Sequence, residues 1–225
     1  MQVLIPVRFY GLDSIMYVVS AIIGFFVSYY AYRLYDITSK KSHFYFFMSF
    51  TVLSMSLLII GITSGFAYLN YFAYHQSPTL LDALASVDDF GYWIYYIGSF
   101  AAYCLLAYTY LPEKAKFPIL IPFWYSAFPY FNILSLFLVS YIAFRSFVNF
   151  ATKKTLNSFL VTIAFGGIAL YHFFLLFTSF SNIIYLTPTF SFIFGKFLYI
   201  LAHLSLMAGF LSLLVMLVRV NRSER

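Results

Sequence analysis

Charged residues are scarce in this sequence. Only 9% of its 225 residues are Asp, Glu, Lys or Arg, whereas 63% are hydrophobic and the mean hydropathy is +0.89. A soluble globular domain carries about a quarter of its residues as charged side chains, so this composition excludes that class. The sequence therefore predicts an all-α, polytopic integral membrane protein of the cell membrane, with a single transmembrane domain over residues 1–225.

Cysteine and catalytic motifs are nearly absent. The one cysteine, Cys104, excludes an intramolecular disulfide. We find no Cys/His cluster with metal-ligand spacing, no phosphate-binding glycine loop, no nucleophile elbow and no pair of acids inside an apolar run. These absences favour a protein that is not an enzyme and that holds no metal or cofactor.

The basic residues lie in short clusters between apolar runs, and they give a formal net charge of +6. Such clusters orient a membrane protein, because Lys and Arg stay on the cytoplasmic side, and they contact anionic lipid headgroups. We therefore expect the lipid bilayer, and not a nucleic acid, to be the partner of these charges.

The number of membrane crossings depends on one ambiguous region. Single crossings are expected at 13–32, 44–70, 90–111, 156–180 and 190–219. The run 117–150 is too long for one crossing and short for two. If it crosses twice, at 117–128 and 133–150, all 13 basic residues except Arg8 and Lys196 fall on one side. This bias predicts a seven-helix bundle with its N-terminus outside and its C-terminus cytoplasmic.

The connections between these runs carry signals of their own. Residues 71–89 contain three acids and no Lys or Arg, and they are expected to form the longest loop. Residues 129–132, which begin with Pro129 and end with Asn132, are expected to reverse the chain between the fourth and fifth helices, because Pro and Asn favour turns.

Small residues at helical spacing mark two surfaces for close helix packing. They are Gly61 and Gly65 in the second run, and Ser158, Thr162, Gly166 and Ala169 in the sixth. We predict that one surface is used inside the bundle and that the other contacts another membrane chain or a second copy.

Two of the four histidines, His172 and His203, lie inside apolar runs. Each is about 10 Å below the outer edge of the apolar core at 1.5 Å per residue, so both are expected to face the bundle interior at similar depth. They could be neutral, hydrogen-bonded residues, axial ligands of a b-type haem, one end of a quinone pocket or a proton relay. Lys196 and Tyr199 share a helical stripe with His203, which makes these three a candidate polar face for a ligand.

Two segments resemble a known group of proteins. The junction YAYRLYDITSKKSHFYFFMSF, residues 30–50, resembles the first helix–loop–helix of mostly archaeal seven-helix membrane proteins, and LAHLSLMAGFLSLLVMLVR, residues 201–219, is similar to the end of their last helix. These proteins resemble the sensory input modules placed ahead of histidine kinases and transcription regulators. The resemblance implies a sensor-like bundle and supplies no catalytic residues. Because no output domain follows the last helix here, we expect the bundle to act through a separate partner.

Three functions remain open from the sequence. We expect a non-catalytic accessory subunit or sensor-like module that binds a membrane partner or a small apolar ligand. The alternative is an electron-transfer subunit that binds haem b or quinone through His172 and His203. A transporter is the third possibility, and only the prolines at 118, 122 and 129 support it.

Overall fold

The structure, a computed structural model, describes residues 11–74, 78–111, 128–181 and 188–223, which form six α-helices. They are α1 (Leu12–Thr38), α2 (Lys41–Tyr74), α3 (Pro78–Tyr110), α4 (Phe128–Lys153), α5 (Leu156–Ser181) and α6 (Pro188–Ser223). Each contains a stretch long and apolar enough to cross a membrane. The chain is therefore a multi-pass integral membrane protein.

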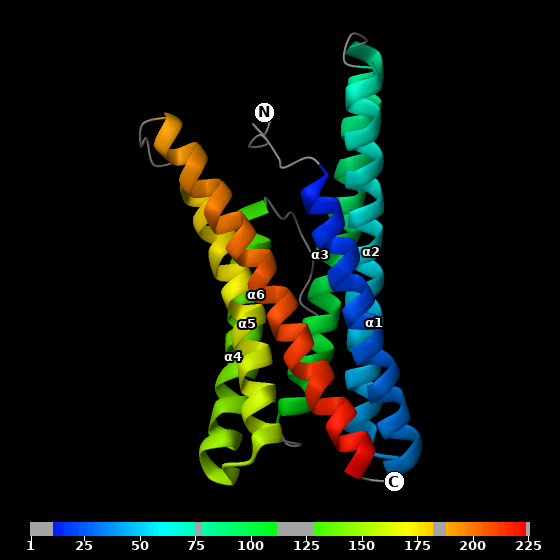
Figure 1. The fold of residues 1–225 in the computed structure, drawn as a ribbon, viewed down its shortest axis with the longest axis vertical. Helices are drawn as coiled ribbons and strands as arrows, with labels where there is room; N and C mark the ends of the chain where they lie inside the picture. The colour runs from blue at the N-terminus through cyan, green and yellow to red at the C-terminus, as the bar shows by residue number, and fades with distance from the viewer. Residues whose placement is uncertain (1–10, 75–77, 112–127, 182–187, 224–225) are drawn as a thin grey trace.

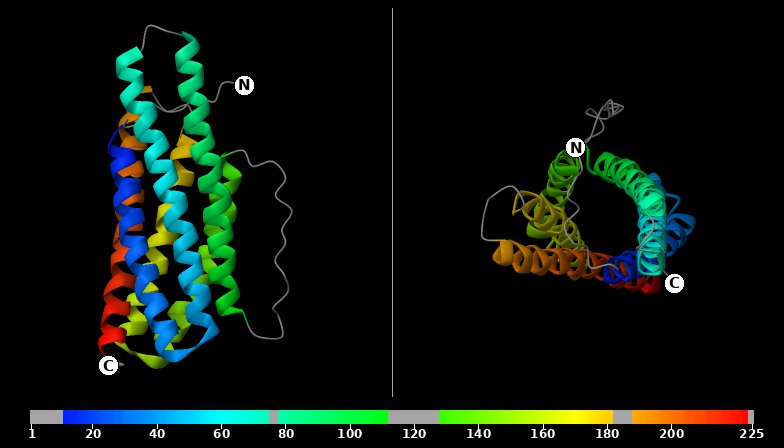
Figure 2. Two further views of the ribbon diagram at one scale, coloured as in Figure 1. Left: turned by 90° about the vertical axis from the view of Figure 1, so that its right-hand side faces the viewer. Right: turned by 90° about the horizontal axis from the view of Figure 1, so that it is seen from above.

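The six helices pack as a ring that follows their order in the sequence, and α1 contacts α6 to close it (Figure 1, Figure 2). Helices α1, α3, α4 and α6 run in one direction, and α2 and α5 run in the other (Figure 1). Because α3 and α4 are parallel, Tyr110 at the end of α3 and Phe128 at the start of α4 lie at opposite ends of the bundle. The loosest junction in the ring is the one between α3 and α4.

Most basic residues of the described chain gather at one end of the bundle, which we call the basic end. The α1–α2 turn, the α4–α5 turn and the last turn of α6 all lie there (Figure 1). The basic residues in or beside these turns are Lys40, Lys41, Lys153, Lys154, Arg219 and Arg222. The arrangement expected from the charge bias, with these clusters at one end, is present in the fold.

Glycines set the closest helix contacts. A Cβ atom on Gly61 would lie 2.8 Å from Val18 of α1, and one on Gly167 would lie 2.7 Å from the carbonyl oxygen of Ser205 on α6. Gly65 faces α1 in the same way. Because a side chain at these positions would push the helices apart, the α1–α2 and α5–α6 contacts require glycine. Gly61 and Gly65 thus serve the packing of the bundle itself.

Residues 71–89 do not form the long loop expected from the sequence. Helix α2 continues to Tyr74 and α3 already begins at Pro78. A proline is well tolerated at the first helical position, and the Leu- and Ala-rich residues that follow are good helix formers. Such residues allow the helix to extend beyond the apolar stretch that the sequence predicts to cross the membrane, 90–111.

The expected chain reversal at residues 129–132 is also wrong. These residues form the first turn of α4, where a proline costs no hydrogen bond because the first backbone amides of a helix have no partner within it. Helix α4 therefore covers Phe128–Lys153 in place of the predicted 133–150. The predicted short helix at 117–128 lies outside the described residues, except for Phe128.

Candidate functional site: a buried tyrosine and histidine cluster

The interior of the ring contains hydroxyl, imidazole and amide groups from five of the six helices. They belong to Tyr17 on α1, Tyr95 and Tyr103 on α3, Asn132 on α4, Tyr171 and His172 on α5, and Tyr199 and His203 on α6. All of them except the partly buried Tyr199 are at most 2% exposed. We call this set the interior polar cluster. Burying polar groups inside a membrane costs free energy, so such a set is a candidate functional site.

His172 joins three helices through its two ring nitrogens. Its Nδ1 lies 3.1 Å from Oδ1 of Asn132 on α4, and its Nε2 lies 2.9 Å from the hydroxyl of Tyr103 on α3. Because an amide oxygen can only accept, Nδ1 carries the proton and Nε2 accepts the hydroxyl proton of Tyr103. The hydrogen-bonding capacity of His172 is therefore fully used, and it bridges the loosest junction of the ring.

His203 has the same protonation pattern but lacks the second partner. Its Nδ1 donates to the backbone carbonyl of Tyr199 at 3.0 Å, which makes Nε2 the acceptor. That Nε2 atom is buried and has no hydrogen-bond partner among the described residues. The rings of Tyr199, Tyr17 and Tyr171 surround it, with centroids 4.5, 4.9 and 5.6 Å from the imidazole centroid. A buried acceptor next to three aromatic rings thus lacks a hydrogen-bond partner among the described residues.

The tyrosine hydroxyls pair across the ring. The hydroxyl oxygens of Tyr95 and Tyr171 are 2.8 Å apart, a short hydrogen bond between α3 and α5. Those of Tyr17 and Tyr199 are 3.4 Å apart, beyond the usual range for two hydroxyls. The first pair is therefore a strong link within the cluster, and the second is a weak one that a small shift would break.

The two histidines lie in one layer of the bundle. Tyr171 packs edge-on against both rings, at 4.9 Å from His172 and 5.6 Å from His203, and both imidazoles are 0% exposed. Both histidines therefore face the bundle interior and contact the same tyrosine, whereas their depth in the membrane stays a prediction.

This geometry does not fit a haem with two histidine ligands. Such a haem needs one free nitrogen from each imidazole on opposite sides of a single iron. Both nitrogens of His172 are hydrogen-bonded, and the ring of Tyr171 contacts each histidine. The described residues also contain no group of three or more His, Cys, Asp or Glu side chains that could hold a metal ion.

Of the three residues predicted to form a polar face on α6, two contact each other. Tyr199 and His203 touch through both the backbone hydrogen bond and their rings. Lys196 is partly buried one turn further from the basic end. Sequence reasoning missed the tyrosines of α1, α3 and α5 as members of the site. The recurrence of Tyr95, Ser99 and Tyr103 every four residues is a polar stripe that would have marked the inner face of α3.

Comparison with family models, with curated proteins and with solved structures finds no match to this chain. The resemblance to seven-helix sensor-type bundles therefore stays a prediction from the sequence.

Proposed function

We propose that this chain is a non-catalytic, sensor-like or accessory membrane protein whose interior polar cluster binds a small, largely apolar ligand. The observation that carries this proposal is the open, buried Nε2 of His203. A buried acceptor without a partner costs about 1–3 kcal/mol, which a bound donor would recover. The tyrosine rings around it would contact the apolar body of the ligand.

The protonation pattern of His203 restricts the ligand. Because Nδ1 donates to a carbonyl, Nε2 accepts, so the complementary ligand carries a hydroxyl or another hydrogen-bond donor. An oxidised quinone offers only carbonyl acceptors and does not complement this nitrogen. A phenol, an alcohol or a reduced quinol does. At His203, a ligand hydroxyl is therefore better supported than the carbonyl of an oxidised quinone.

Two probes of nearly equal shape test this proposal. Phenol can donate to Nε2, and toluene cannot. In protein labelled with ¹⁵N-histidine we expect phenol, but not toluene, to shift the Nε2 resonance of His203. The His203→Phe variant keeps an aromatic ring beside Tyr17, Tyr171 and Tyr199 and should lose phenol binding. Ser205→Ala is the matched control, because that hydroxyl bonds only to its own helix, at Leu201. Equal responses to both probes, or binding that survives in His203→Phe, would refute the proposal.

The orientation of the fold supports seven crossings. Tyr110 and Phe128 lie at opposite ends of the bundle, so a further passage of the chain between α3 and α4 is required to join them. We infer seven crossings, with the basic end cytoplasmic and the N-terminus outside. Cysteine accessibility, described in the Discussion, tests this orientation.

The glycines that do not pack inside the bundle indicate where another membrane chain could bind. Gly61 and Gly65 face α1, whereas a Cβ atom on Gly166 would meet nothing within 4 Å. Ser158, Thr162 and Ala169, on the same helix, are partly exposed. We infer that this face of α5 is where another membrane chain or a second copy packs, since small residues allow close backbone approach. Native mass spectrometry of a Gly166→Leu variant tests this inference.

A further inference from the structure

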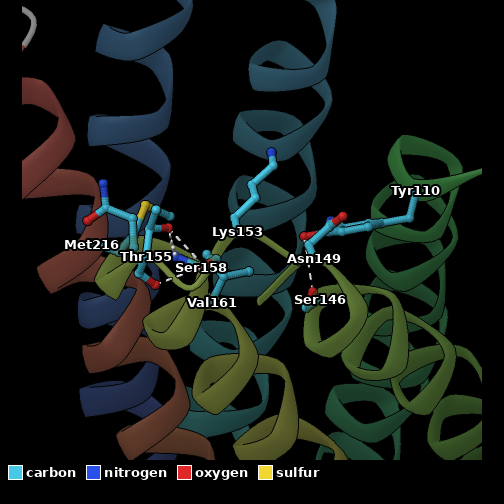
Figure 3. A pocket seen from close by; sticks show the side chains of 9 residues that line it. Tyr110, Ser146, Asn149, Lys153, Thr155, Ser158, Val161 and Met216 are labelled. Carbon is cyan, nitrogen blue, oxygen red and sulfur yellow. Dashed lines mark hydrogen bonds between the residues drawn. The ribbon is translucent and has the colours of Figure 1, made fainter. Parts of the chain in front are cut away.

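A hollow of about 280 Å³ opens at the basic end, where α3, α4, α5 and α6 come together (Figure 3). Its lining consists of Tyr110, Ser146, Asn149, Lys153, Thr155, Asn157, Ser158, Val161 and Met216. None of these residues belongs to the interior polar cluster. The hollow is therefore a second candidate site, independent of the one assigned to the proposed ligand.

The chemistry of the lining is polar with a single positive charge. Only Val161 and Met216 are apolar, and both pack against the hydrophobic core. Lys153 is the one charged residue in the lining, which contains no acid. The side chain of Lys153 is exposed and makes no ion pair or hydrogen bond with any residue that the structure describes. Its ammonium group is thus available to an anion.

The other polar groups offer both donors and an open acceptor. The hydroxyl of Tyr110 lies 3.4 Å from Oγ of Ser146, too far for a strong hydrogen bond, so it can still donate to a bound group. Asn157 has a buried Oδ1 atom without a hydrogen-bond partner among the described residues. Thr155 is already used at the start of α5, where its Oγ1 accepts the backbone N–H of Ser158 at 3.3 Å. The site thus combines a cation, a hydroxyl donor and one unsatisfied acceptor.

We propose that this hollow binds a phosphate monoester. A monoester carries several acceptor oxygens, and in its singly charged form it also has a P–OH group, since its second pKa is about 6. Lys153 pairs with the charge, Tyr110 donates to a phosphoryl oxygen, and Oδ1 of Asn157 accepts from the P–OH group. The same chemistry is presented by phosphatidic acid in the membrane and by water-soluble phosphate esters.

Variants at two adjacent lysines separate a specific site from general attraction to a basic surface. Lys153 lines the hollow, whereas the neighbouring Lys154, which is also exposed, does not. Binding of inorganic phosphate and of glycerol 3-phosphate would be measured by calorimetry in detergent. Native mass spectrometry after mixing with phosphatidic acid, and with phosphatidylcholine as the control lipid, would measure lipid binding. We expect Lys153→Met to weaken binding about tenfold, as for loss of one charge-assisted hydrogen bond, and Lys154→Met to change it less than about twofold.

The outcomes identify the source of the phosphate. Binding of the soluble probes alone supports a water-soluble ester, and binding of phosphatidic acid alone supports the lipid. Asn157→Leu should weaken binding of the soluble probes or of phosphatidic acid, whichever the hollow binds. This second test leaves the surface charge unchanged. The proposal is overturned if neither source binds, if phosphatidylcholine binds as well as phosphatidic acid, or if the two lysine variants lose affinity equally.

Discussion

The hydrogen bond between Tyr95 and Tyr171 makes a sharp prediction about what holds the ring together. Both side chains are buried, at 2% and 0% exposure, and their hydroxyl oxygens are 2.8 Å apart. Replacing either tyrosine by phenylalanine removes one hydroxyl and keeps the ring, so the packing of the cluster is preserved. The effect on unfolding then reports the hydrogen bond between α3 and α5.

The expected magnitude follows from what each variant leaves behind. A single Tyr→Phe change leaves the other hydroxyl buried without its partner, which should cost about 1 kcal/mol of unfolding free energy. This value lies between the average of about 0.6 kcal/mol and the maximum of about 1.7 kcal/mol for hydrogen bonds between membrane helices. The double variant replaces both hydroxyls by apolar groups of the same shape, and it should cost no more than either single change. The coupling energy between the two positions is therefore expected to be about 1 kcal/mol.

Tyr17 and Tyr199 provide a matched control, because their hydroxyls are 3.4 Å apart. A double-mutant cycle on this pair should give a coupling below about 0.3 kcal/mol, since the contact is too long for a strong hydrogen bond. Both cycles can be measured by reversible unfolding in mixed detergent and SDS micelles, followed by tryptophan fluorescence and near-ultraviolet circular dichroism. Equal coupling in the two cycles, or no coupling between Tyr95 and Tyr171, would refute this account of the cluster.

Two further predictions test the orientation and the partner surface. In a Cys104→Ala background, cysteines placed at the exposed Ser86 and Ser223 should be labelled from opposite sides of the membrane, Ser223 from the cytoplasm; labelling of both from one side would contradict seven crossings. Gly61→Leu should lower the yield of folded protein because α1 occupies that position, whereas Gly166→Leu should fold and lose its partner in native mass spectra. A wild-type protein that is monomeric at every concentration, with no second membrane chain bound, would rule out the partner surface.

The membrane segments could be predicted from the sequence because each one has to match the apolar interior of the bilayer. A run of about 20 apolar residues is required for each crossing, and five of the expected runs lie within helices of the structure. The helix ends were not readable in the same way. Outside the hydrocarbon core, local propensity decides whether a helix continues, and the residues after Pro78 continue it where hydropathy had predicted a loop.

In the interior polar cluster, the histidines could be predicted from the sequence but the tyrosines could not. A histidine in an apolar run stands out, so His172 and His203 were found, whereas 22 tyrosines in one chain give no such contrast. Which tyrosines face inward depends on helix rotation and on neighbours that are distant in the sequence, as for Tyr17 and Tyr199. Asn132, which accepts a hydrogen bond from His172, was expected in a turn and lies instead one turn inside α4.

His172 and His203 look alike in the sequence, but their hydrogen bonding differs in the structure. Both ring nitrogens of His172 are hydrogen-bonded, one to Asn132 and one to Tyr103. His172 thereby links α5 to α3 and α4, whose mutual contact is the loosest in the ring. A group committed in this way cannot take a ligand without releasing a structural bond. His203 has the same tautomer, but its Nε2 has no hydrogen-bond partner among the described residues. His172 is therefore committed to helix packing, whereas the ligand site that we propose depends on His203.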